Sequence, residues 1–175
     1  MQHVGTLQSK KTMEDKKSRN KLVNPYWITG FTDGEGCFSV SFNRREKLKL
    51  KVEVRPSFSI SESYKRGSPF RGVDRVQQFL GCGFIRYSRT DGTYKYEVRS
   101  LKELCERVIP HFDKYPLETV KQLDYQPFRK IVFLMREGKH LHRETLLEIL
   151  DFAFVMNPSG KRRYDKESIL KFLKS

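Results

Sequence analysis

The pattern of hydrophobic and polar positions becomes regular from residue 24 onward. Asn24 is a good helix N-cap and Pro25 suits the first helical position. Aromatic residues and a glycine then recur at helical spacing from Tyr26 to Phe31. Together these signals predict a short helix that runs to about residue 33.

Two stretches of alternating apolar and polar residues follow this helix. Residues 37–43 place apolar side chains at even positions, and residues 48–60 repeat the arrangement with cations and serines at most odd positions. A period of two is typical of half-buried strands. Pro56 shares the apolar parity and has no N–H to donate, so it should mark a bulge, a bend or an edge position.

The rest of the pattern predicts a second hairpin and several helices. The hairpin is expected over residues 84–88 and 94–99, with its turn at Asp91-Gly92. Helices are expected over residues 73–80, 101–108 (stopped by Pro110), 120–135, 143–156 and 166–173. This order of elements predicts an α+β fold.

The length of the chain, 175 residues, suits one domain with tails. Residues 1–22 are polar and rich in lysine, and they show neither helical nor strand periodicity. We therefore expect a flexible basic arm over residues 1–22, a main domain over residues 23–157 and a tail with a short helix over residues 158–175.

The charge of the chain indicates a polyanionic partner. Thirty-five Lys and Arg against 21 Asp and Glu give a formal net charge of +14, and the pI is about 9.8. Ribosomal and membrane-surface proteins share this balance, so charge alone does not choose among them.

No apolar run is long enough to cross a bilayer, and residues 1–17 lack the apolar core of a secretion signal, which predicts a soluble intracellular protein with no membrane partner. The three cysteines are widely spaced, which favours free thiols in a reducing compartment.

Residues 28–36, Ile-Thr-Gly-Phe-Thr-Asp-Gly-Glu-Gly, carry the most specific signal. Gly30 and Gly34 fall on one helix stripe, where two such helices could pack backbone to backbone, and Trp27 and Phe31 would flank that seam. A helix ends with unpaired carbonyls and a negative dipole, so Glu35 is unfavourable there unless a cation joins it. The carboxylate of Glu35 and the main-chain carbonyl of Gly34 are hard oxygen ligands that suit Mg2+.

The stretch NPYWITGFTDGEGCFSV, residues 24–40, resembles the LAGLIDADG homing endonuclease family, and FDKYPLETVKQLD, residues 112–124, resembles the segment that follows the fourth strand in that family. The likeness covers about residues 24–157 and contains one copy of the motif. It implies an αββαββα fold with a saddle-shaped antiparallel sheet over DNA, helices behind it and extra C-terminal helices. A single motif implies a homodimer that cuts both strands of a roughly palindromic target of about 20 base pairs.

The same resemblance assigns roles at the catalytic centre. It makes Glu35 the catalytic and metal-binding carboxylate, and it places Lys121 near the scissile phosphate, where a cation offsets developing charge. Ser61 falls where relatives often carry Gln or Lys to orient water, so its part in catalysis is open. Asp33 is expected to cap or orient backbone near the seam. Taken alone, an acidic glycine-rich helix end is more often a plain C-cap and turn, and Lys121 could equally be a solvated lysine on a helix face.

The polar faces of the strands are the expected DNA-reading surface, because a twisted antiparallel sheet fits the major groove. An ordinary solvated sheet face would look similar but would usually carry mixed charge, whereas cations dominate here. The residues assigned to this surface are Ser39, Ser41, Asn43, Arg45, Lys47, Lys49, Lys51, Arg55, Ser57, Ser59, Arg86, Ser88, Arg89, Lys95, Glu97 and Arg99.

Two other functions remain open from the sequence. One is a maturase that binds intron RNA, and the other is a DNA-binding relative that has lost cleavage. The presence of Glu35 and Lys121 argues against the second, and nothing in the sequence excludes the first. The resemblance further implies a gene inside a mobile intron, and therefore a protein of a mitochondrion, a chloroplast or a microbial cytoplasm.

Overall fold

A four-stranded antiparallel sheet in the order β1-β2-β4-β3 forms one layer of the molecule. The computed structural model describes residues 23–63, 71–158 and 160–173, so the basic arm expected over residues 1–22 lies outside it. The strands are β1 (Gly36–Arg44), β2 (Val52–Ser63), β3 (Phe84–Ser88) and β4 (Thr93–Val98). The predicted α+β fold is confirmed.

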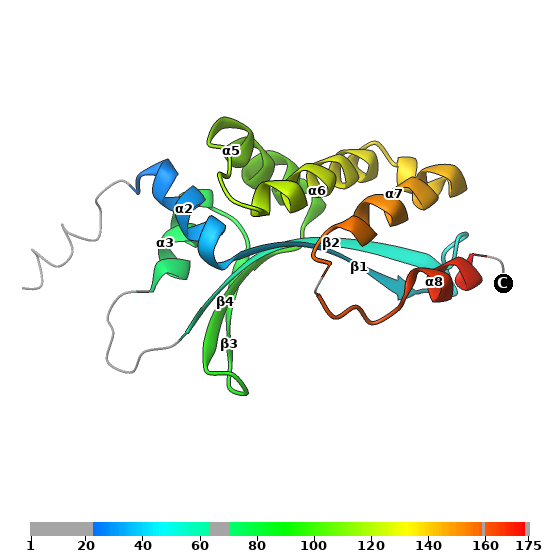
Figure 1. Ribbon diagram of the computed structural model, residues 1–175, viewed down its shortest axis with the longest axis horizontal. Coiled ribbons are helices and arrows are strands. Elements are labelled where there is room, and N and C mark those ends of the chain that lie inside the picture. Colours follow the sequence, from blue (N-terminus) through cyan, green and yellow to red (C-terminus); the bar gives the residue numbers. More distant parts are fainter. Residues whose placement is uncertain (1–22, 64–70, 159, 174–175) are drawn as a thin grey trace, which may run out of the picture.

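The helices lie mostly on one side of this sheet. In Figure 1, α5, α6 and α7 lie above the sheet, and α2 and α8 lie at opposite ends of the molecule. The β3–β4 hairpin is the part of the sheet that extends downward in this view. The helices are α2 (Pro25–Glu35), α3 (Gly72–Leu80), α4 (Leu101–Glu103), η1 (Leu104–Val108), α5 (Ile109–Lys114), α6 (Lys121–Arg136), η2 (Lys139–Leu141), α7 (Arg143–Val155) and α8 (Lys166–Phe172). None of these described helices is long and apolar enough to cross a membrane.

Phe38 of β1 is the centre of the hydrophobic core. Its fully buried ring lies 5.1–5.3 Å from the rings of Phe58, Phe112, Tyr125 and Phe128, which belong to β2, α5 and α6. Aromatic contacts of this kind add to the free energy gained by burying the rings. Because the even-numbered side chains of β1 and β2 face these helices, the odd-numbered side chains point to the open side of the sheet.

The second strand was predicted to begin near Leu48, and this is wrong because it begins at Val52. The chain between β1 and β2 forms hydrogen-bonded turns, in which the Lys51 N–H donates to the Leu48 carbonyl at 2.9 Å and the Arg45 N–H donates to the Lys51 carbonyl at 2.8 Å. Lys51 adopts a left-handed conformation with φ 53°. Lys47, Lys49 and Lys51 therefore lie in the β1–β2 connection, and their alternation with leucines is not a strand pattern.

Pro110 was expected to stop a helix, and this is also wrong. Helix α4 passes without a break through η1, a π-helix, into α5, which ends at Lys114. The Ile109 N–H donates to the Leu104 carbonyl five residues earlier, which is the wider π spacing. A proline normally clashes with the carbonyl four residues before it, and the wider turn here accommodates the ring of Pro110.

The other residues predicted to mark helix ends and strand edges are confirmed in these roles. The Asn24 side chain caps α2 by accepting from the Tyr26 N–H at 2.9 Å, and Gly81 ends α3 in a left-handed conformation. Pro56 lies where β2 has β1 as its only paired neighbour, because pairing with β4 begins at Phe58. This is the edge position that the sequence allowed for.

The segment after residue 157 packs along the outer edge of β1. Arg162 donates from Nη1 to the Val40 carbonyl at 3.2 Å and from Nη2 to the carbonyls of Met156, at 2.8 Å, and Ala153. Ile169 of α8 is buried against the same core. The C-terminal residues described here are therefore part of the folded unit.

His111 is buried between α2 and the aromatic core. Its Nε2 lies 3.4 Å from the Thr29 hydroxyl, and its ring packs against Phe79, Phe112 and Tyr115. Burial disfavours the charged imidazolium and lowers the pKa of His111 to about 4, against 6.5 in an exposed histidine. Between these values the unfolded chain binds more protons than the folded chain.

We therefore expect the free energy of unfolding to be highest above about pH 6.5 and to fall as the pH drops towards 4. His111→Phe removes one titrating group and should lessen this fall, to which His140, whose pKa burial also lowers, contributes too; His142→Phe, at an exposed position, should leave the fall unchanged. Urea unfolding measured from pH 7 to pH 4 tests this. A fall of parent size in His111→Phe would show that other groups cause it.

Candidate nucleic-acid interface and catalytic centre

Helix α2 presents an exposed stripe of small residues beside aromatic ones. Gly30 and Gly34 are exposed, and a Cβ atom added at either would meet no heavy atom within 4 Å, so nothing in the described chain requires glycine there. Trp27 and Phe31 stack beside the stripe with their ring centroids 5.2 Å apart. By contrast, a Cβ at Gly36 would lie 2.5 Å from Thr32. The fold thus explains Gly36 but not the two glycines of the stripe.

Asp33 ties the end of α2 to the start of α6. Its carboxylate accepts from the Glu118 N–H at 3.1 Å, from the Thr119 N–H at 3.3 Å and from the Thr119 hydroxyl at 2.7 Å. The expectation that Asp33 caps backbone is confirmed by these contacts. Lys121 is the first residue of α6, so this cap sets the position of Lys121 relative to the end of α2.

Glu35 and Gly34 lie exposed at the end of α2. The Gly36 N–H donates to the Thr32 carbonyl and completes the helix, which leaves the later carbonyls without helical partners and gives this end a partial negative charge. Within the described residues, no group of three or more His, Cys, Asp or Glu side chains could hold a metal ion. At this end of α2 the described residues offer a divalent metal the Glu35 carboxylate and main-chain oxygens, which suit Mg2+ in type but do not fill its coordination shell.

Lys121 and Ser61 lie at the same end of the sheet as Glu35. Burial raises the pKa of the Cys37 thiol, while the positive charges of Lys121 and Lys95 lower it, so both lysines lie close to the start of β1. Ser61 pairs with Lys95 and directly follows Ile60, the partner of Gly36. The structure thus brings these predicted residues towards one another, and their catalytic roles remain predictions.

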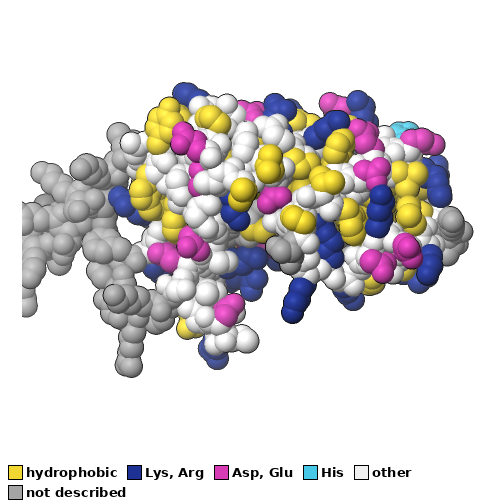
Figure 2. All heavy atoms as spheres, in the orientation of Figure 1, with side chains coloured by type: hydrophobic (Ala, Val, Ile, Leu, Met, Phe, Trp, Pro, Cys, Tyr) yellow, Lys and Arg dark blue, Asp and Glu magenta, His cyan; other side chains and the backbone are white. Residues whose placement is uncertain are grey.

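The open face of the sheet forms an ordered polar surface. Register aligns Asn43 with Glu53, Ser41 with Arg55 and Ser39 with Ser57 across β1 and β2, and it continues the row of Ser61 through Lys95 to Arg86. A cavity of about 480 Å³ opens on this face and is lined in part by Ser39, Ser41, Arg55, Ser57, Lys95, Glu97 and Arg99. Figure 2 shows Lys and Arg side chains along the lower side of the molecule, and others over the helical layer above it.

The residues predicted to read DNA fall into three groups. Those that share the open face are Ser39, Ser41, Asn43, Arg55, Ser57, Arg86, Ser88 and Lys95, with Arg99 directly after β4. Those that lie in connections between strands are Arg45, Lys47, Lys49, Lys51 and Arg89. Ser59 and Glu97 belong to the face by register but are only 4% and 3% exposed, so neighbouring side chains cover them.

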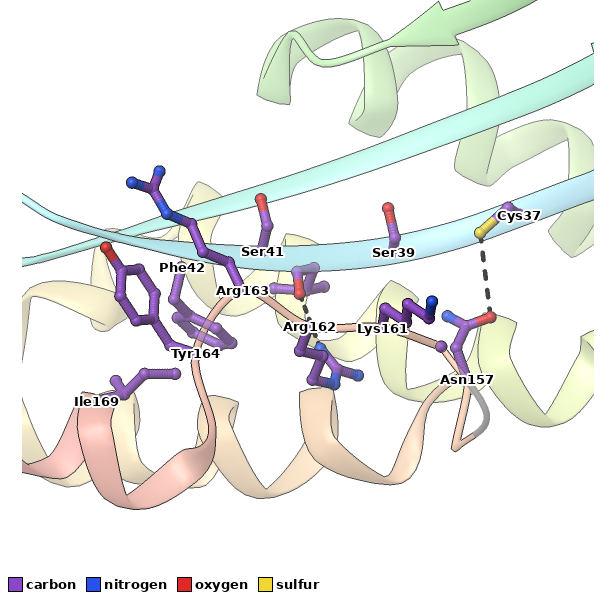
Figure 3. Close-up of a pocket in the computed structure, with 12 residues that line it drawn as sticks. Cys37, Ser39, Ser41, Phe42, Asn157, Lys161, Arg162, Arg163, Tyr164 and Ile169 are labelled. Carbon is purple, nitrogen blue, oxygen red and sulfur yellow. Dashed lines mark hydrogen bonds between the residues drawn. The ribbon is translucent and has the colours of Figure 1, made fainter. Parts of the chain in front are cut away.

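A basic residue that the sequence reasoning missed lies on the C-terminal segment. In Figure 3, Arg163 points to the same side of β1 as Ser39 and Ser41, whereas Arg162 points to the other side and binds backbone. A cavity of about 330 Å³ is lined by residues of this segment and of β1. The run Lys161-Arg162-Arg163 was visible in the sequence, but only the fold shows which of these cations extends the polar face.

Comparison with known proteins is consistent with this geometry. A family model described as LAGLIDADG endonuclease matches residues 28–132, which is more than half of the chain. The chain belongs to the LAGLIDADG endonuclease family. The resemblance noted in the sequence is therefore confirmed.

Relatives within the LAGLIDADG family share both sequence and fold. "Probable intron-encoded DNA endonuclease 1" of Mycosarcoma maydis is 34% identical over 155 residues, 88% of this chain and 54% of that protein. The crystal structure of the homing endonuclease I-TnaI is 34% identical with a TM-score of 0.74, covering 88% of this chain and 98% of that one. I-SmaMI "bound to uncleaved DNA target in the presence of Calcium ions" is 30% identical with a TM-score of 0.75, covering 86% and 49%.

The chain spans between about a quarter and about half of the length of the first three curated relatives, at 54%, 29% and 26%. It spans nearly all of the I-TnaI chain. What the longer relatives do as whole proteins is therefore carried to this chain only as a proposal.

The Asp33 cap yields a prediction about stability. Asp33→Asn keeps the shape but weakens the charge-assisted hydrogen bonds to Thr119 and to the backbone, and we expect a loss of about 1 kcal/mol in the free energy of unfolding. Asp151→Asn removes an exposed carboxylate paired with Lys166 and should change stability by much less. Urea unfolding compares the two, and equal effects would show that the cap contributes little.

Proposed function

We propose that the protein is a site-specific endonuclease that binds double-stranded DNA as a homodimer and hydrolyses one phosphodiester in each strand with a divalent metal, Mg2+. The observation that carries the proposal is the continuity of three features at one end of the sheet: the exposed glycine stripe, the exposed Glu35 carboxylate after it and the cationic polar face that begins at β1. Membership of the LAGLIDADG endonuclease family supports the same reaction class.

The dimer is proposed through α2. Its exposed Gly30 and Gly34 allow close backbone approach, and a second copy of α2 across a twofold axis would cover Trp27 and Phe31 as well. This arrangement also addresses the incomplete metal site. A twofold seam brings the Glu35 carboxylates of two subunits together, and DNA phosphates and water can supply the remaining oxygen ligands.

Different residues of the chain would have different roles at the scissile phosphate. Glu35 and the Gly34 carbonyl would hold the metal, which when bound supplies an activated water and a positive charge for the departing oxygen. Lys121 would offset charge that develops on the phosphate, and Asp33 would fix the distance between α6 and the end of α2. Ser61 would hold solvent beside Lys95 rather than act directly.

The DNA would lie along the open face of the sheet. Arg55, Arg86, Lys95 and Arg99, together with serines and Asn43, can address base edges in the major groove, while the lysines of the β1–β2 connection can reach phosphates at the outer flank. The proposed domain covers residues 23–157, with the C-terminal segment packed on its edge.

Binding of intron RNA as a maturase is retained as the second function. The relative from Mycosarcoma maydis is named as probably intron-encoded, and a cationic surface tolerates RNA as well as DNA. An organelle is the proposed location on the same ground. Loss of cleavage with retained DNA binding is not favoured, because Glu35 and Lys121 are both in place.

The first functional prediction concerns Glu35. Glu35→Gln keeps the shape of the side chain but removes the charge that a metal needs, so we expect target binding in Ca2+ to persist while cleavage in Mg2+ falls by about two orders of magnitude or more. Glu118→Gln makes the same change at another exposed carboxylate, three residues before α6, and should cut at nearly the parent rate. Cleavage of a plasmid library that spans candidate insertion sites, with Mg2+ and then with EDTA, measures this. Cleavage by Glu35→Gln at the parent rate would remove the proposed catalytic centre.

The second prediction concerns the seam. Gly30→Leu adds a side chain into space that is open in one chain, so the subunit should still fold but the dimer should dissociate. Gln78→Leu adds the same side chain at an exposed position of α3 and should leave the dimer intact. Sedimentation of both variants, with circular dichroism as a check of folding, decides the matter. A stable dimer of Gly30→Leu would place the interface elsewhere.

A further inference from the structure

Glu97 is a buried carboxylate in the middle of a surface that is otherwise cationic. Register places it in one row with Ser59 of β2 and Phe84 of β3, on the open face of the sheet. Its side chain is nevertheless only 4% exposed. A charge that is covered to this extent costs free energy unless its neighbours compensate it.

Three cations surround this carboxylate. Arg99 Nη2 lies 2.7 Å from Oε2, Arg86 Nε lies 3.9 Å from Oε2, and Lys95 Nζ lies 3.8 Å from Oε1. The three basic side chains are themselves 28–49% exposed, so their outer parts remain available to a ligand. We call Glu97 with these three residues the Glu97 cluster.

The Glu97 cluster opens onto the cavity of the polar face and is only partly satisfied. Glu97, Lys95 and Arg99 all line that cavity of about 480 Å³. Glu97 Oε2 is buried without a hydrogen bond of good geometry, although Arg99 is close. The Arg99 guanidinium also lies over the Phe84 ring, 5.7 Å from its centroid, which limits where it can move.

We infer that Glu97 is a positioning residue for sequence readout: it holds Arg99, Arg86 and Lys95 in fixed orientations on the sheet and cancels part of their attraction for phosphates. This inference rests on the proposed DNA-binding function. A guanidinium distinguishes guanine only when its plane is held against the base edge, whereas a mobile arginine binds any phosphate. A covered carboxylate between the cations favours the first behaviour and opposes the second.

Glu53 offers a matched control on the same face. It is the other acidic residue of the paired strands' open face, and it accepts from Asn43 Nδ2 at 3.3 Å and from Arg45 Nε at 3.2 Å. Its side chain is 33% exposed, and its row lies at the end of β1 away from α2, whereas the Glu97 row aligns with Cys37 near α2. Removing the negative charge of Glu97 or of Glu53 raises the net charge of the DNA-facing surface by the same amount. The two changes would lie opposite different base pairs of the bound target.

The experiment compares Glu97→Gln, Glu53→Gln, Arg99→Gln and the parent in two measurements. The first is selection from a pool of duplexes with a randomised 24-base-pair segment, a length of about two helical turns, followed by sequencing of the bound fraction. The second is affinity for the unselected pool as a function of salt concentration. Circular dichroism and thermal unfolding are measured on every variant.

We expect Glu97→Gln to bind the unselected pool roughly three- to tenfold more tightly at about 0.1 M salt, because one more cation per subunit is free to displace counterions. Its selected sequences should lose base preference at one or two adjacent positions in each half-site, nearer the centre than any change caused by Glu53→Gln. Arg99→Gln should lose preference at the same positions and bind the unselected pool more weakly. Glu97→Gln and Arg99→Gln would thus change the affinity for the unselected pool in opposite directions while losing base preference at the same positions. Destabilisation of the fold alone would not produce this combination.

Selected sequences and pool affinity that match the parent in Glu97→Gln would overturn the inference. If Glu97→Gln does not fold, the double variant Glu97→Gln/Arg99→Gln replaces it, because this variant removes one charge of each sign. A loss of base preference at target positions other than those affected by Arg99→Gln would then overturn the inference equally. If the parent itself enriches no sequence, the proposed DNA recognition fails, and the inference about Glu97 fails with it. That result is distinguishable from a parent that selects a clear target and a Glu97→Gln variant that selects the same one.

Discussion

The packing of Phe38 and its aromatic neighbours against α5 and α6 is the interaction on which the rest of the structure depends. It covers one face of the sheet with the even-numbered side chains of β1 and β2. Because side chains alternate along a strand, the odd-numbered side chains lie on the other face. A shift of one residue in register would exchange the two faces and bury the serines and arginines. The core thus determines which side chains are free to meet a ligand, although it contains none of them.

The candidate catalytic centre follows from the same sheet through its first strand. Because β1 begins directly after α2, the carboxylate of Glu35 and the polar face are joined with no linker between them. The Asp33 cap binds Thr119, 86 residues further along the chain, and so brings the following helix α6 with Lys121 to this junction. The candidate catalytic residues and the polar face therefore lie on adjoining parts of one folded unit, which would hold their spacing along a bound ligand constant.

Much of this was readable from local sequence signals. Asn24-Pro25, Gly81 and Asp91-Gly92 marked boundaries correctly because each acts through its own backbone conformation. The β1–β2 connection was misread because leucines and lysines alternate there by composition, and only long-range pairing shows where a strand begins. Pro110 was misread because a π-helix changes which carbonyl the ring approaches. The burial of Glu97 and the placement of Arg163 depend on residues from distant strands and segments, so no local pattern could reveal them.

Arg162 illustrates a consequence for the edge of the sheet. Strand β1 is an edge strand, and an uncovered edge presents free backbone groups that other chains can pair with. The guanidinium of Arg162 binds the Val40 carbonyl, and the segment that carries it runs beside β1 (Figure 3). The Val40 carbonyl is therefore occupied and not free to accept a hydrogen bond from a strand of another chain, a consequence that is separate from any contact with a nucleic acid.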